Sequence, residues 1–292
     1  MIGEHLHPGA TNRKATDQGR IVGAVGLVAL IVLSVVATLA GVNWKLIAIS
    51  WTAFAAMAVG APLGARVVRS SHPLEPVWGY GLASGAMVTS AALFLIPQAL
   101  GQHGRLGSLG IAVGFLGGYV GHTIGHGFTH MDLPVDHTAT ELTVHALSAG
   151  AIIGAIYTAM PSLTSILGIA LISHKAPAGY AAARRLAERG QSVAVLLLPA
   201  AAVGLVALPV GIVGFSPGSE LRGLLFGVAA GVFLHVAVDL LPECTTGSET
   251  CPVDAADYDG DIHQFQDRLR RHAALSSLLG GFAVVIAWSF VV

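Results

Sequence analysis

Long apolar runs, separated by short polar stretches, cover most of the chain. A helix needs about 20 predominantly apolar residues to cross the hydrocarbon core of a bilayer, and many apolar segments of the chain reach that length. The pattern therefore predicts an all-α integral membrane protein that lies in the lipid bilayer. The predicted spans are residues 21–42, 47–68, 77–100, 107–128, 141–160, 163–185, 192–214, 221–242 and 272–292.

The fifth and sixth predicted spans, 141–160 and 163–185, follow one another almost directly, and each carries one histidine. His145 lies in the first, and His174 lies in the second, where Lys175 follows it at once. Ionisable side chains inside lipid are costly, usually face the interior of the bundle and usually mark a pathway. These two helices are therefore the predicted functional centre.

Composition narrows the class of protein. Hydrophobic residues make up 54% of the chain and charged residues 11%, against about 25% charged residues in soluble domains. A net charge of −1 gives no electrostatic basis for a nucleic-acid partner. Thirteen histidines, almost as many as the 15 lysines and arginines together, indicate metal or proton chemistry. The two cysteines, Cys244 and Cys251, cannot form a disulfide framework.

The distribution of lysine and arginine predicts the orientation. If the N-terminus lies in the cytoplasm, the outer loops contain only Lys45, Arg105 and Arg222, and the other basic residues outside the spans fall on the inner side. This segregation follows the positive-inside rule and places the C-terminus outside. Residues 1–20 are then expected to be a mobile cytoplasmic tail. The first span could alternatively be a cleaved signal peptide, although its apolar core is longer than usual.

Ionisable residues recur every four positions, a spacing that places them on one face of a helix. At about 1.5 Å per residue, His145, His174 and His235 fall at similar depths, which predicts that they share one interior. Imidazole suits zinc, iron, copper and nickel, and carboxylate extends the range to manganese. Three series have this four-residue spacing: His122, His126 and His130; His137, Glu141 and His145; and His235, Asp239 and Glu243.

Each of these features also has a plain structural interpretation. A histidine inside a membrane can be a hydrogen-bonded packing residue, and the histidines of span four can belong to a solvated loop. The ammonium of Lys175 needs a carboxylate such as Asp239 or Glu141, or it takes the place of a bound cation. Glycines fall on two faces of 107–128, which predicts a helix pressed against its neighbours rather than facing lipid.

Four segments together resemble the ZIP (Zrt/Irt-like) family of divalent-metal transporters, in a sub-branch with an HKAPA motif. They are SHKAPAG at 173–179, VHALSAGAIIGA at 144–155, FGVAAGVFLHVAVDLLPE at 226–243 and GLASGAMVTSAALFLIPQ at 81–98. The resemblance implies a bundle of eight helices over residues 47–292, with 21–42 as an extra N-terminal span. The histidine-rich segment 122–137 lies where the family has its cytoplasmic histidine loop. The composition of the chain itself predicts an acidic cytoplasmic loop at 243–272.

The chain departs from the family pattern at three positions. The acids expected after His145 and on the next helix are Ala149 and Ala178, and Gln98 replaces a glutamate. The residues that match the family pattern are His145, His174 and Asp239, together with Glu243, four residues after Asp239. The resemblance therefore implies a single metal site in which Lys175 substitutes for the charge of a second ion.

The sequence thus predicts transport of a divalent metal ion toward the cytoplasm. Zinc is the expected substrate, with Fe²⁺, Mn²⁺ or Cd²⁺ as further candidates, and no organic cofactor is expected. His235, Glu141, His122, His126 and His130 would relay the ion. Two alternatives are a membrane-embedded zinc-dependent hydrolase and a metal sensor that does not transport. The glycine-rich faces of the helices are compatible with a homodimer.

Overall fold

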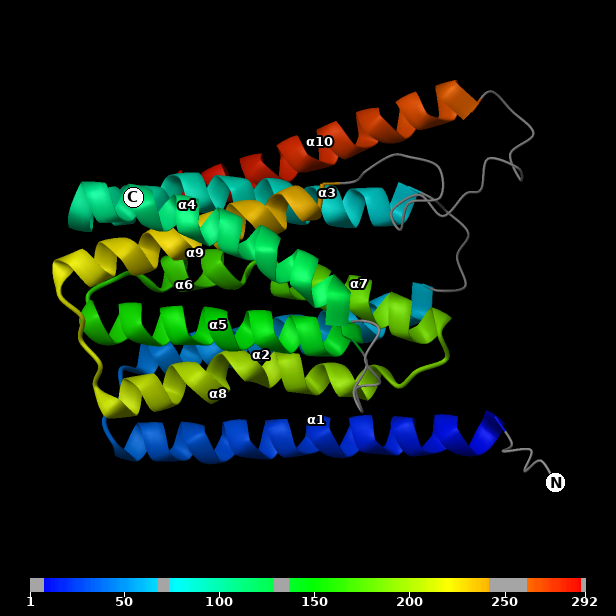
Figure 1. Ribbon diagram of the computed structural model, residues 1–292, viewed down its shortest axis with the longest axis horizontal. Helices are drawn as coiled ribbons and strands as arrows, with labels where there is room; N and C mark the ends of the chain where they lie inside the picture. The colour runs from blue at the N-terminus through cyan, green and yellow to red at the C-terminus, as the bar shows by residue number, and fades with distance from the viewer. Residues whose placement is uncertain (1–7, 68–73, 129–136, 242–261, 290–292) are drawn as a thin grey trace.

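The protein is almost entirely helical in the part that its computed structural model describes, residues 8–67, 74–128, 137–241 and 262–289 (Figure 1). No strand occurs in these ranges. The elements are α1 (Pro8–Leu39), α2 (Trp44–Val67), α3 (Leu74–Ser90), the π-helix η1 (Ala91–Leu95), α4 (Ile96–Phe128), α5 (His137–Ala159), α6 (Ser165–Ile172), α7 (Lys175–Glu188), the 3₁₀ helix η2 (Val193–Leu196), α8 (Leu197–Val213), α9 (Ser219–Asp239) and α10 (Ile262–Ser289).

Seven helical segments of the described chain are long and apolar enough to cross a membrane, which confirms the all-α membrane class. They are Gly19–Leu39, Trp44–Arg66, Val77–Gly121, Leu142–Ala159, Val193–Val213, Ser219–Asp239 and His263–Ser289. The helices run side by side along the long axis of the molecule, with α1 and α10 at opposite edges (Figure 1). The largest buried cluster includes residues of α5, α8 and α9.

The segment Val77–Gly121 is 45 residues long, about twice what one crossing of a bilayer needs. It is a hairpin rather than one rod. His103 has an extended backbone (φ −161°, ψ 100°), and beyond it Gly107 lies directly against the carbonyl oxygen of Ala99. The chain therefore reverses at His103, as the two separate predicted spans 77–100 and 107–128 require.

Glycines bring several helix pairs into backbone contact. Gly81 and Gly85 of α3 lie against Ser276 and Ser277 of α10. Gly60 of α2 lies against the backbone of α7 in the same way. Small residues at such contacts allow the van der Waals packing that holds membrane helices together.

The prediction that α4 is enclosed on both glycine faces is half wrong. Gly114 lies against the backbone of Val228 in α9, but nothing lies within 4 Å of a methyl group placed at Gly117 or Gly121. Val113 and Val120, which lie on the same side of α4 as Gly117, are 51% and 49% exposed. One face of α4 therefore packs in the bundle, and the other is open to lipid.

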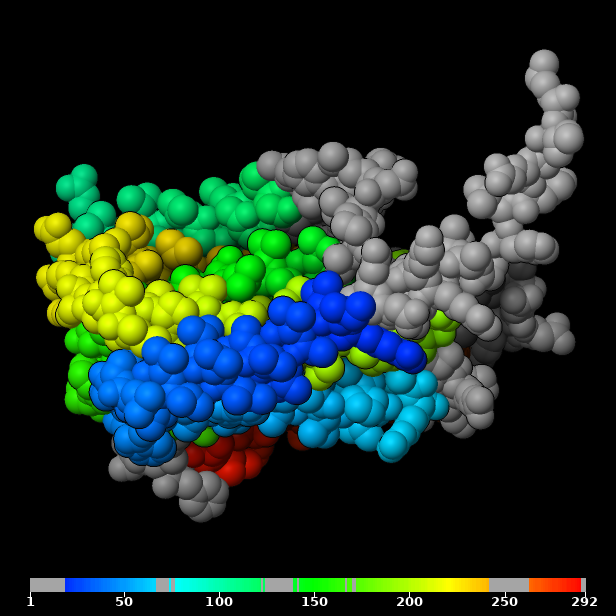
Figure 2. All heavy atoms as spheres, turned by 90° about the horizontal axis from the view of Figure 1, so that it is seen from below, coloured from blue at the N-terminus to red at the C-terminus, as the bar shows by residue number. Residues whose placement is uncertain are grey.

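Three expected boundaries are wrong. α1 begins at Pro8, so most of the tail expected at 1–20 is helical, and α10 begins at Ile262, inside the loop expected at 243–272. α4 continues to Phe128, inside the histidine-rich loop expected at 122–137. Proline suits a first helical turn because its missing N–H would have had no partner there. α1 packs on α8 along the outside of the bundle, where Figure 2 shows it in blue.

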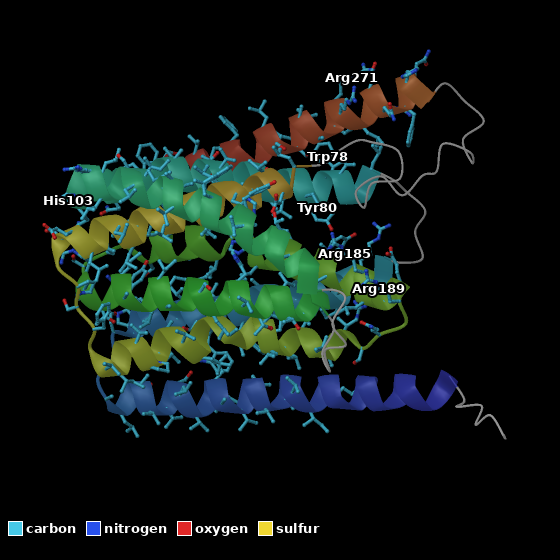
Figure 3. The ribbon with its side chains drawn as sticks, in the orientation of Figure 1. Trp78, Tyr80, His103, Arg185, Arg189 and Arg271 are labelled. Atoms are coloured by element: carbon cyan, nitrogen blue, oxygen red, sulfur yellow. The ribbon has the colours of Figure 1, made fainter. Side chains whose placement is uncertain are left out.

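The basic residues that Figure 3 labels gather toward one end of the bundle. Arg185, Arg189 and Arg271 lie toward the end at which the N-terminus is found, whereas His103 lies at the opposite end (Figures 1 and 3).

Candidate metal site

The two histidines of the central helices meet inside the bundle. His145 lies in the middle of α5, and His174 lies in the two-residue turn between α6 and α7. Their Nε2 atoms are 3.3 Å apart, and their ring centroids are 5.4 Å apart with the planes at 72°. Without a ligand, one ring donates a hydrogen bond to the other. The pair predicted from the sequence is therefore formed.

The sixth predicted span is not one continuous helix. It is broken at Ser173 and His174, between α6 and α7. Pro177 has no N–H to donate to the carbonyl of Ser173, and the next turn resumes with a hydrogen bond from Ala178 N to His174 O at 2.9 Å. The break places His174 at the N-terminal end of α7, beside α5.

Tyr157 holds the entry to α6, and nothing in the sequence singled it out. Its hydroxyl donates to the carbonyl of Thr164 at 2.7 Å and accepts from the amide of Gly168 at 2.8 Å. The side chain is fully buried. It ties α5 to the first turns of α6, the helix that leads to His174, so Tyr157 is a positioning residue for the histidine pair.

His174 lies in a dry part of the bundle. Its side chain is buried, and the ring of Phe233 from α9 packs against it edge to face, with the centroids 5.2 Å apart. On the other side α7 lies close to α2, where Gly179 contacts Met57. Charge–charge interactions are stronger in such a place than in water. Phe233 is a neighbour of His174 that sequence spacing could not identify.

Lys175 is the most unusual residue of the site. It is 1% exposed, and its Nζ has no hydrogen-bond partner among the residues described. The pairing suggested with Asp239 is not formed. Lys175 directly follows His174 in the chain and begins α7. A buried ammonium without a partner is costly, so this charge is a defining property of the site.

The other predicted ligands of α9 lie elsewhere. His235 Nε2 is 3.1 Å from Asp239 Oδ2, so the four-residue spacing does bring these two together. The ring of His235 contacts Phe115 and Tyr119 of α4. Phe233 and His235 are two residues apart, about 200° around a helix, and so they point in nearly opposite directions. The histidine pair and the His235–Asp239 pair consequently lie on different sides of α9.

The structure does not gather all predicted ligands into one centre. Among the described residues, no group of three or more His, Cys, Asp and Glu side chains is placed to hold a metal ion. His122, His126 and Glu141 lie in the helices α4 and α5, but their side chains are outside the description. His130 and Glu243 lie outside the described residues altogether.

The separation of the two pairs predicts the behaviour of an Asp239→Asn variant. Because its carboxylate is bound to His235 and not to the histidine pair, the zinc affinity of the purified protein should stay within about threefold of the wild type. Equilibrium dialysis with radioactive zinc measures this. A loss of about 100-fold would instead place Asp239 among the ligands, as the ZIP resemblance implies.

Comparison with known proteins adds no relative. No protein-family model matches the sequence, and a search of curated proteins finds no significant match.

Proposed function

We propose that this chain is a ZIP-like carrier that moves a divalent metal ion, zinc first, across the membrane toward the cytoplasm. The observation that supports it best is the distance between the two imidazoles. Zinc binds histidine nitrogen at about 2.0–2.1 Å in a tetrahedron, and the edge of such a tetrahedron is about 3.3 Å long. The Nε2 atoms of His145 and His174 are 3.3 Å apart, so an ion could bridge them with little movement of the rings.

The chemistry of the donors supports zinc over harder ions. Both donors are imidazoles, and Ala149 and Ala178 stand where the family would carry acids. Imidazole favours zinc, copper, iron and nickel, whereas manganese prefers carboxylate. Zinc is therefore the proposed substrate, with Cd²⁺ and Fe²⁺ ahead of Mn²⁺.

The break between α6 and α7 supports a carrier rather than a purely structural metal site. Transporters often bind their substrate at interrupted helices near the middle of the membrane, and alternate access by moving one group of helices against another. In this proposal the ion leaves the histidine pair for the inner end of the bundle. The groups that would receive it there are Glu141, His235, Asp239, Glu243, His122, His126 and His130.

Flux into proteoliposomes tests the proposal. The purified protein is reconstituted in vesicles that contain a zinc-sensitive dye, beside a variant with both His145 and His174 replaced by alanine. We expect saturable zinc entry in the wild type and entry at the protein-free rate in the variant. Zinc entry that the double variant retains in full would contradict the assignment of the site. No entry in the wild type, with tight zinc binding preserved, would favour a sensor.

A further inference from the structure

The last helix is longer than a membrane requires. The segment of α10 that could cross the membrane has 27 residues, whereas the hydrocarbon core of a bilayer needs about 20. Three arginines, Arg268, Arg270 and Arg271, stand near its start, and the run 273–289 that follows them contains no charged residue. Charged side chains inside lipid are costly. The arginines therefore lie at the boundary of the hydrocarbon core, at the level of the lipid headgroups.

Two of these arginines lie on the side of α10 that faces lipid. Leu269 and Ala273 form a buried cluster with Val77 of α3. Arg271 is two residues from each of the α10 members of this cluster, about 200° around the helix. Arg271 therefore points away from α3, at the outer edge of the bundle (Figure 3). Arg268 precedes Arg271 by three residues and shares its face, and both side chains are exposed.

The same face continues as an apolar surface. Leu275, Leu278 and Phe282 follow Arg271 by four, seven and eleven residues, which is the spacing of one helix face. They are 47%, 69% and 58% exposed. A phospholipid has its phosphate next to its acyl chains, in the same order as the guanidinium groups and the apolar stripe on this face.

The charge of this surface fits an anionic headgroup. Asp267, the nearest acid in the described sequence, lies 3.8 Å from Arg270, and one acid with three arginines leaves a net charge of +2. Arg271 donates from Nε to the backbone carbonyl of Asp267 at 3.2 Å, which draws its guanidinium toward the start of the helix and away from the hydrocarbon. Guanidinium groups bind phosphate oxygens in pairs, and two of them together repel the cation of a zwitterionic headgroup.

Helix α3 fixes the depth of the arginines. Trp78 Nε1 donates to His272 Nδ1 at 3.2 Å, and Ser276 Oγ donates to the carbonyl of Val77 at 3.3 Å. Tryptophan is enriched at the boundary between lipid and water, so Trp78 and the arginines are suited to the same level of the membrane.

We propose that this face of α10 binds an anionic phospholipid such as phosphatidylglycerol. Arg268 and Arg271 hold the phosphate, and Leu275, Leu278 and Phe282 contact the acyl chains. The inference rests on the membrane-spanning fold and does not depend on a metal at the histidine pair. Inorganic phosphate carries the same charged group but has no apolar part to cover the exposed stripe.

Native mass spectrometry of the full-length protein in detergent tests the proposal. It counts bound lipids as phosphatidylglycerol or phosphatidylcholine with the same acyl chains is added. We expect about a twentyfold preference for phosphatidylglycerol, since each basic residue near a membrane surface contributes about fivefold. Replacing Arg268 and Arg271 together with glutamine should reduce the preference to about twofold or less. Two matched controls should keep it: Arg270→Gln, on another face of α10, and Arg105→Gln, in α4.

The other outcomes contradict the proposal. Equal affinity of the wild type for the two lipids overturns it, and so does a preference that the double variant retains. An equal loss in Arg270→Gln or Arg105→Gln would show an effect of net charge without a site. Displacement of the lipid by inorganic phosphate at equal concentration would assign the arginines to a free anion. Thermal melting without added lipid identifies a variant that fails to fold, and Arg271→Gln, with an expected preference of about fivefold, then replaces the double variant.

Discussion

Zinc binding by the purified protein is expected to fall at least about 100-fold, or about 2.7 kcal/mol, when His174 alone is replaced. The same loss is expected for His145→Ala, and the double variant should be no worse than either single one. The reason is geometric. The 3.3 Å pair holds an ion between two nitrogens, and one imidazole without the other leaves an incomplete site. Groups that act as a unit give non-additive losses.

The controls separate ligation from folding. His174 is fully enclosed, so alanine leaves a cavity, and His174→Leu fills much of that volume without a donor atom. Both variants should lose zinc binding, whereas His263→Ala, at an exposed position in α10, should keep it. Dialysis equilibrium with radioactive zinc gives the affinities. Losses that simply add up in the double variant would mean that each histidine binds zinc in a different place.

The helices could be predicted because a membrane imposes a simple rule on the sequence. In an apolar run that crosses lipid, every backbone N–H and C=O group needs a hydrogen-bond partner, and a helix provides these partners within one segment. The pairing of His145 with His174 was also accessible, since both histidines fall at a similar depth in two consecutive predicted spans. Pro177 marks the region in which the sixth span breaks, although the sequence did not show that α6 would end at Ile172.

What the sequence could not provide was the direction in which each helix faces. Comparing residue positions along the spans gives depth, and depth placed His145, His174 and His235 at one level. Rotation about the helix axis is set by packing against neighbours. In α9 it turns Phe233 toward His174 and His235 toward Phe115 of α4. A residue can therefore lie at the predicted depth and still face a different part of the bundle.

Packing between α2 and α7 should control both stability and zinc binding. The contact at Gly60 is so close that a methyl group there would lie 3.0 Å from the carbonyl carbon of Ala176 and closer still to its oxygen. Overpacking of this kind usually costs about 1–3 kcal/mol. Ala176 is two residues after His174, so the displacement of α7 that relieves the contact also moves the histidine.

We therefore expect Gly60→Ala to lower the melting temperature in detergent and to weaken zinc binding at the same time. Two matched substitutions separate these effects. Gly85→Ala should lower the melting temperature with little change in zinc affinity, because Gly85 contacts Ser277 of α10, in a helix pair that does not carry the histidines. Gly117→Ala, which meets no atom within 4 Å, should be neutral or stabilise the helix by up to about 1 kcal/mol. Unchanged zinc affinity in a destabilised Gly60→Ala protein would show that His174 is held by Tyr157 and α5 alone, independently of how α7 packs on α2.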